Sequence, residues 1–77
     1  MKIIVKYDNE GFVKEVIIKE KIIKILREKY KIHRADFFLD YYLDSFEEGE
    51  LTVFEEEVLN AHPEAVKFLE SITEEVY

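Results

Sequence analysis

The stretch ADFFLDYYLDSF, residues 35–46, decides how this chain folds. Its apolar side chains recur at every third or fourth position, which is typical of one face of an α-helix. These apolar residues are Ala35, Phe38, Leu39, Tyr42, Leu43 and Phe46. Asp36, Asp40 and Asp44 form an acidic stripe along another side. A helix over 35–46 is therefore the element that the sequence predicts most strongly.

The same helix carries two further aromatic residues, Phe37 and Tyr41, outside its main apolar face. At about 100° per residue they project almost opposite the centre of that face. They either anchor an interface with another chain or are covered by the hairpin or last helix of the same chain. A chain of 77 residues has little material to cover both sides, which favours the interface. We expect Phe37 and Tyr41 to be its anchors, with Asp40 and Asp44 as its polar rim.

Two runs of β-branched and aromatic residues, at 2–7 and 12–18, precede this helix. Gly11 lies between them and can adopt the left-handed conformation of a tight turn. We therefore predict a β-hairpin over 2–18. The apolar run at 16–18 places side chains on both sides of its strand, so we expect both faces of the hairpin to be covered.

Other helix signals lie on both sides of residues 35–46. Apolar spacing after the hairpin predicts one helix, and Thr52 with Glu55 forms a capping box for another. We expect this second helix to bury Phe54 and Val58. Pro63 suits the first turn of a last helix. The three additional predicted helices span about 20–31, 53–60 and 63–76.

Together these elements predict an α+β fold. An N-terminal β-hairpin would be followed by three to four short α-helices packed as one small domain over residues 1–77. So small a core rarely contributes more than about 3–5 kcal/mol, and the sequence contains no cysteine to form a disulfide. We therefore expect a homo-oligomer or a permanent protein partner.

Charge is divided unevenly along the chain. Residues 1–34 contain ten basic and five acidic residues, whereas residues 35–77 contain one basic and thirteen acidic residues, which gives the overall net charge of −7. The two halves could bind partners of opposite charge, associate head to tail between copies, or pair with each other across the surface of one molecule.

A nucleic-acid-associated regulator is an alternative reading, based on the basic N-terminal region. The cations that would contact phosphate are Lys14, Lys21, Lys24, Arg27, Lys31 and Arg34. Residues 20–46 have the order of a helix-turn-helix motif, but the second helix carries three Asp and no Lys or Arg, which repels phosphate. A further alternative is an acidic inhibitor that mimics nucleic acid with the C-terminal half.

Residues for catalysis or metal binding are scarce. The chain has two His, His33 and His62, two Ser and no Cys, and its two Gly lie far apart in turns. These residues form neither a nucleophile–base pair, nor a phosphate-binding glycine loop, nor a zinc or calcium motif. We therefore expect a non-enzymatic protein without a metal or cofactor.

One local stretch runs from Leu43-Asp44 through Gly49-Glu50-Leu51-Thr52 and on to Glu55, Leu59 and His62-Pro63. It resembles the zinc-binding anti-sigma domain. In that domain a similar helix start leads to a His-x-x-x-Cys-x-x-Cys cluster. His62 and Ala65 stand where the pattern has cysteines, so the resemblance does not extend to the metal site, and we do not carry its function over.

The longest apolar runs have three residues, far fewer than the roughly 20 that span a bilayer, and the N-terminus lacks the apolar segment of a signal peptide. We expect a cytoplasmic protein that does not contact membranes. The absence of Gln and the abundance of Glu, Lys and Ile are typical of proteins from very hot environments.

Overall fold

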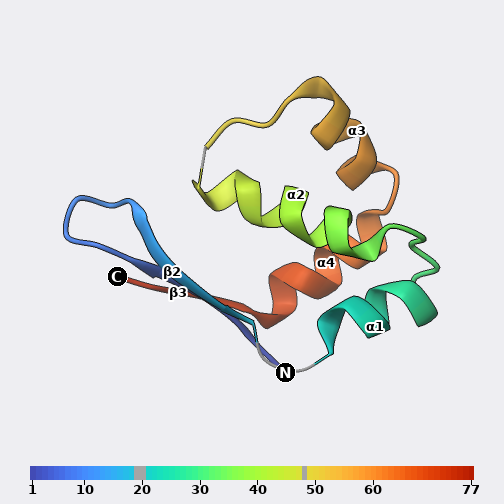
Figure 1. Cartoon of the computed structure of the whole chain (residues 1–77), viewed down its shortest axis with the longest axis horizontal. Coiled ribbons are helices and arrows are strands. Elements are labelled where there is room, and N and C mark those ends of the chain that lie inside the picture. Colours follow the sequence, from blue (N-terminus) through green and yellow to red (C-terminus); the bar gives the residue numbers. More distant parts are fainter. Residues whose placement is uncertain (19–20, 48) are drawn as a thin grey trace.

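In the computed structural model, which describes residues 1–18, 21–47 and 49–77, four helices lie in the sequence between two N-terminal strands and one C-terminal strand. The elements are β1 (Ile3–Tyr7), β2 (Val13–Ile18), α1 (Ile22–Glu28), α2 (Ala35–Glu47), α3 (Val53–Asn60), α4 (Pro63–Ile72) and β3 (Thr73–Val76). Figure 1 shows the strands projecting to one side and the helices gathered on the other. The predicted α+β fold with an N-terminal hairpin is confirmed.

The hairpin turn is held by the backbone and side chain of Asp8. β1 and β2 are antiparallel, with Val5 opposite Val16. In the turn, the Asp8 carboxylate accepts hydrogen bonds from the backbone N–H groups of Glu10 and Phe12, at 2.9 and 3.0 Å. Gly11 has a φ of 89°, the left-handed conformation that the sequence predicted for this position.

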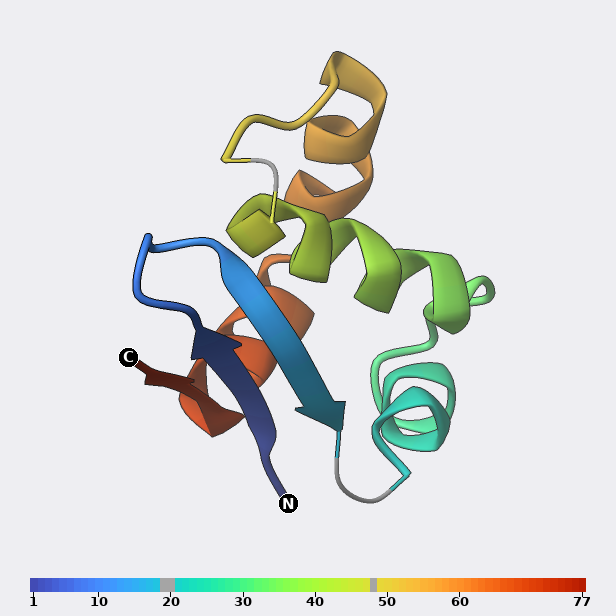
Figure 2. The same cartoon turned by 60° about the vertical axis from the view of Figure 1, so that its left-hand side comes forward.

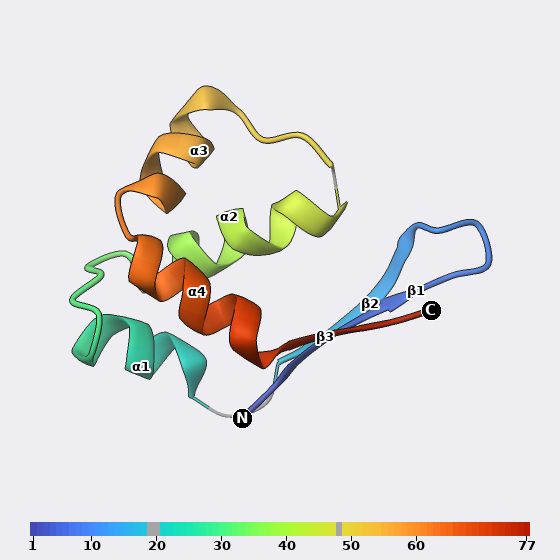
Figure 3. The same cartoon turned by 180° about the vertical axis from the view of Figure 1, so that it is seen from behind.

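A third strand replaces the end of the predicted last helix. The prediction of a helix over 63–76 is wrong beyond Ile72, because Thr73 has an extended conformation and begins β3. β3 pairs in parallel with β1, which gives the sheet order β2-β1-β3. Figure 3 shows α4 leading directly into β3 alongside the hairpin. The free edge of β1 offers backbone hydrogen bonds that a last helical turn would not use.

The first helix is shorter than predicted. The sequence suggested about 20–31, but α1 ends at Glu28, and residues 19 and 20 lie outside the described part of the chain. Beyond the helix, Lys31 adopts a φ of 58°, and the N–H of Ile32 donates to the carbonyl of Leu26 at 3.1 Å. The chain therefore changes direction at Lys31 and Ile32 and continues to α2.

The core lies between one face of the sheet and the helices, and α2 runs through its centre (Figure 2). The inner face of α2 buries Ala35, Phe38, Leu39 and Tyr42 against side chains of β1 and of the other three helices. α2 and α3 have nearly the predicted limits. The expectation that both faces of the hairpin are covered is wrong, because the helices gather on one side of the sheet (Figures 1 and 3). On the other face, the opposed residues Ile4 and Ile17 are only partly buried.

The basic and acidic parts of the sequence meet in the sheet. The ammonium group of Lys2, the residue before β1, lies 3.2 Å from the carboxylate of Glu74 in β3 and forms an ion pair with it. The hydroxyl of Tyr7 donates to the Glu75 carboxylate at 2.7 Å. Desolvation, followed by this hydrogen bond and the charge of Glu75, raises the pKa of Tyr7 to about 12.

Candidate interaction surface

The outer side of α2 carries a pair of stacked aromatic rings. Phe37 and Tyr41 lie one helical turn apart, with ring centroids separated by 6.3 Å and ring planes inclined by 14°. Phe37 is 42% exposed and Tyr41 is partly buried. Neither the hairpin nor the last helix encloses this pair completely, so its outer surface is available for contact.

The aromatic surface continues onto α3. The ring of Phe54 meets that of Tyr41 edge-on, at a centroid distance of 6.0 Å and an angle of 78°. The prediction that Phe54 is buried is wrong: this side chain is 62% exposed, because α3 turns Leu59 rather than Phe54 into the core. Phe37, Tyr41 and Phe54 form a continuous row, which we call the aromatic ridge.

A cation extends the ridge at the beginning of α2. The carbonyl of Arg34 accepts the hydrogen bond from the Phe38 N–H at 3.0 Å, which places Arg34 immediately before the helix. Its guanidinium carbon lies 4.3 Å from the centroid of the Phe37 ring. This cation–π contact holds the charge in line with the aromatic rings.

Two grooves flank Phe37 and Tyr41. The first has a volume of about 460 Å³ and lies between α2 and α3, with Phe54 and Val58 in its lining. The second has a volume of about 470 Å³ and lies between α2 and β2, with Val16 in its lining. Because both rings line both grooves, they form a raised strip with a hollow on each side.

Charge differs along α2 on this surface. Arg34 lies immediately before the helix and lines the first groove, whereas Asp40, Asp44 and Glu47 lie further along the helix and line the second. Hydrogen bonds from the Thr52 backbone and hydroxyl lower the pKa of Glu55, and a hydrogen bond with Asp44 acts in the same direction. The predicted rim residues Asp40 and Asp44 therefore lie beside the predicted anchors, within an acidic end that also includes Glu55.

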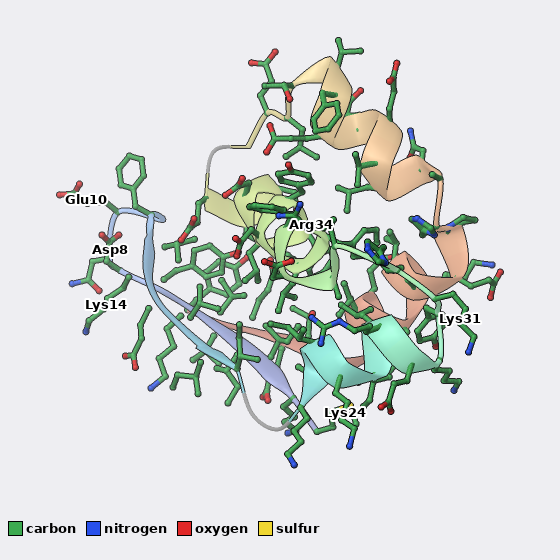
Figure 4. All side chains as sticks on the ribbon, turned by 45° about the vertical axis from the view of Figure 1, so that its right-hand side comes forward. Asp8, Glu10, Lys14, Lys24, Lys31 and Arg34 are labelled. Carbon is green, nitrogen blue, oxygen red and sulfur yellow. The ribbon has the colours of Figure 1, made fainter. Side chains whose placement is uncertain are left out.

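The cations of the nucleic-acid reading are spread over the molecule. All six are exposed, and they are Lys14, Lys21, Lys24, Arg27, Lys31 and Arg34. In Figure 4, Lys14 lies at the hairpin end with Asp8 and Glu10, while Lys24 and Lys31 lie on the opposite side of the molecule. Lys14 therefore does not share one basic face with Lys24 and Lys31. The positions of these cations add no support to the nucleic-acid hypothesis.

His62 packs against the core instead of pointing into a polar site. Its ring meets that of Phe38 edge-on, with centroids 5.6 Å apart, and its side chain makes no capping hydrogen bond at the start of α4. Across residues 1–18, 21–47 and 49–77, no three His, Asp or Glu side chains group as a metal site. Within the same ranges, no helix combines the length and apolar character needed to cross a bilayer.

Comparisons with known proteins give no relative from which the role of this surface could be inferred, so its interpretation rests on its geometry. No protein family, no curated protein and no solved structure matches the chain. The features that define the site are the aromatic ridge, the two grooves beside it, and the opposite charges at its ends.

Proposed function

We propose that this protein is a small non-enzymatic protein–protein interaction module that associates with a second copy of itself through the outer side of α2. Phe37 and Tyr41 are the anchors of this interface, and Asp40 and Asp44 belong to its polar rim. The association stabilises a molecule whose small core has no disulfide to reinforce it.

The observation that carries this proposal is the exposure of the aromatic ridge. Phe37 and Phe54 are 42% and 62% exposed, although each ring touches the ring of Tyr41. Clustered aromatic residues are enriched at the centres of protein interfaces, where they contribute a large share of the binding free energy. Burying their exposed apolar area contributes roughly 25 cal/mol per Å² before the entropic cost of association is subtracted.

Replacing both anchors by serine tests the proposal. The F37S/Y41S variant should be monomeric at concentrations where the wild type associates, as measured by sedimentation equilibrium. Its circular dichroism should remain native, because Phe37 is exposed and Tyr41 is only partly buried. Phe12→Ser is the matched control: Phe12 is 66% exposed but lies at the hairpin turn, so this variant should associate like the wild type.

A second variant separates folding from association. If F37S/Y41S unfolds, Phe54→Ser provides the test, because Phe54 is the more exposed end of the same ridge. Weakened association of folded Phe54→Ser supports the proposal. If F37S/Y41S is folded and associates like the wild type, the proposal is contradicted. The same holds for folded Phe54→Ser.

A further inference from the structure

Four residues form a regular stripe along the outer side of α2. Arg34, Phe37, Tyr41 and Asp44 follow one another at intervals of three, four and three residues. At about 100° per residue, these four positions fall within an arc of about 80° around the helix axis. The stripe begins with a cation, has two aromatic rings at its centre and ends with an anion.

We infer that the second copy docks with its α2 antiparallel to α2 of the first, so that Arg34 of each copy pairs with Asp44 of the other. Phe37 of each copy then lies against Tyr41 of the other. This inference rests on the proposed self-association and specifies its geometry. It also places Arg34, which belongs to the alternative nucleic-acid surface predicted from the sequence, in the protein interface.

The spacing of the stripe supports this register. The midpoint between Phe37 and Tyr41 is position 39, and the midpoint between Arg34 and Asp44 is also position 39. A single two-fold axis at this level therefore matches both the aromatic pair and the charged pair. Two-fold dimers use the same patch on both subunits, and alternating spacings of three and four residues are those of paired helices.

The charges favour the antiparallel over the parallel arrangement. A parallel pair would place the two Arg34 side chains together and would also bring the two Asp44 side chains together. In the antiparallel pair, each Arg34 reaches the acidic end formed by Asp44 with Asp40, Glu47 and Glu55. Carboxylates that lie close together are stabilised by a nearby cation.

The cation is also held in position before docking. The guanidinium of Arg34 lies over the ring of Phe37, at 4.3 Å from the centroid, so part of its side-chain freedom is already lost. The grooves of about 460 and 470 Å³ beside Phe37 and Tyr41 offer space for side chains of the second copy. Ridge and grooves thus allow the two surfaces to interlock.

Charge reversal tests the register through its symmetry. Arg34→Asp and Asp44→Arg should each raise the dissociation constant of the dimer about tenfold, because each change converts two attractive pairs into repulsive ones. An equimolar mixture of the two variants should form a heterodimer with an affinity within about threefold of the wild type. In this heterodimer both charged pairs are attractive: one is the unaltered Arg34–Asp44 pair, and the other joins the two substituted positions with the charges exchanged.

Two variants control for net charge. Lys24→Glu changes the charge as Arg34→Asp does, but on α1, and Glu70→Arg changes it as Asp44→Arg does, but near the end of α4. Both should associate within about threefold of the wild type, and mixing them should have no effect. Analytical ultracentrifugation of each variant and of the mixtures provides the measurement.

The outcomes distinguish the register from the self-association itself. If the mixture of Arg34→Asp and Asp44→Arg fails to restore affinity while F37S/Y41S is still monomeric, the antiparallel register is wrong and the aromatic interface stands. If the wild type is monomeric, both the register and the proposed self-association are overturned. Weakened association of Arg34→Asp and Asp44→Arg alone, restored when the two are mixed, supports the register, provided that both control variants associate like the wild type alone and mixed.

Discussion

The hydroxyl of Tyr42 on α2 lies 2.8 Å from the hydroxyl of Thr73, the first residue of β3. Thr73 donates its own hydroxyl proton to the carbonyl of Leu69 at 2.6 Å, so Tyr42 is the donor in the bond between the two hydroxyls. This bond joins the buried side of α2 to the point where α4 becomes β3. It therefore fixes the helix that presents the aromatic ridge relative to the sheet.

Removing this bond should lower the free energy of unfolding. Tyr42→Phe loses one hydrogen bond, which costs about 1 kcal/mol. Thr73→Val should cost more, up to about 3 kcal/mol, because it leaves the buried Tyr42 hydroxyl without its acceptor. Urea denaturation of both variants and of the double variant provides the measurement. An additive double variant would show that the two hydroxyls are not coupled.

Lys31 is a site where glycine should stabilise the protein. Its φ of 58° lies in the left-handed region, where a side chain costs about 1 kcal/mol and glycine costs nothing. Lys31→Gly should therefore raise the free energy of unfolding by about 0.5–1 kcal/mol, as measured by thermal or urea denaturation. This is the reverse of the usual effect of glycine.

Lys29 provides the matched control for this prediction. It lies two residues earlier with a right-handed φ of −82° and ψ of −42°, and its N–H donates to the carbonyl of Ile25. Lys29→Gly should lower the free energy of unfolding by up to about 1 kcal/mol. Equal destabilisation by both glycine variants would contradict the assigned backbone conformation of Lys31.

Stability should decline in alkaline solution as Tyr7 ionises. Its pKa is raised from 10.0 to about 12, because desolvation and the nearby Glu75 disfavour the phenolate. A raised pKa in the folded state stabilises the fold fully below pH 10, and this stabilisation is lost as pH rises towards 12. Thermal unfolding between these pH values measures the loss.

Glu75→Gln should weaken this pH dependence, because it removes the negative charge beside the Tyr7 hydroxyl. Ultraviolet titration of the five tyrosines should then show Tyr7 ionising at lower pH than in the wild type, with a smaller shift in the same direction for Tyr42, whose pKa the charge of Glu75 also raises. Glu74→Gln, which alters the adjacent residue paired with Lys2, is the control and should leave the Tyr7 titration unchanged. An unchanged titration in Glu75→Gln would contradict the assigned role of Glu75.

Elements with strong local signals were predictable from the sequence. The periodicity of residues 35–46 predicted α2, and the capping box of Thr52 and Glu55, present in the structure at 3.0 and 3.2 Å, marked the start of α3. β3 was not predictable in this way, because its stability depends on pairing with β1, some 70 positions away in the sequence. The positions of Ile72 and Val76 fit the continued helix equally well.

The candidate site was predictable in part. Helical geometry alone set Phe37 and Tyr41 apart from the buried face of α2. Phe54 was missed, because a position four residues before Val58 in a short helix does not reveal which side of that helix faces the core. Arg34 was assigned to a basic surface, since only the folded chain shows its guanidinium over the ring of Phe37.

The absolute mass of the wild-type protein in solution tests the central claim most directly. Size-exclusion chromatography with light scattering, over a range of concentrations and at low and high salt, provides this mass. We predict a species of twice the chain mass that persists in high salt, because the aromatic ridge supplies most of the interface and apolar burial is not screened by ions. A monomer at all concentrations and both salt conditions would contradict the account.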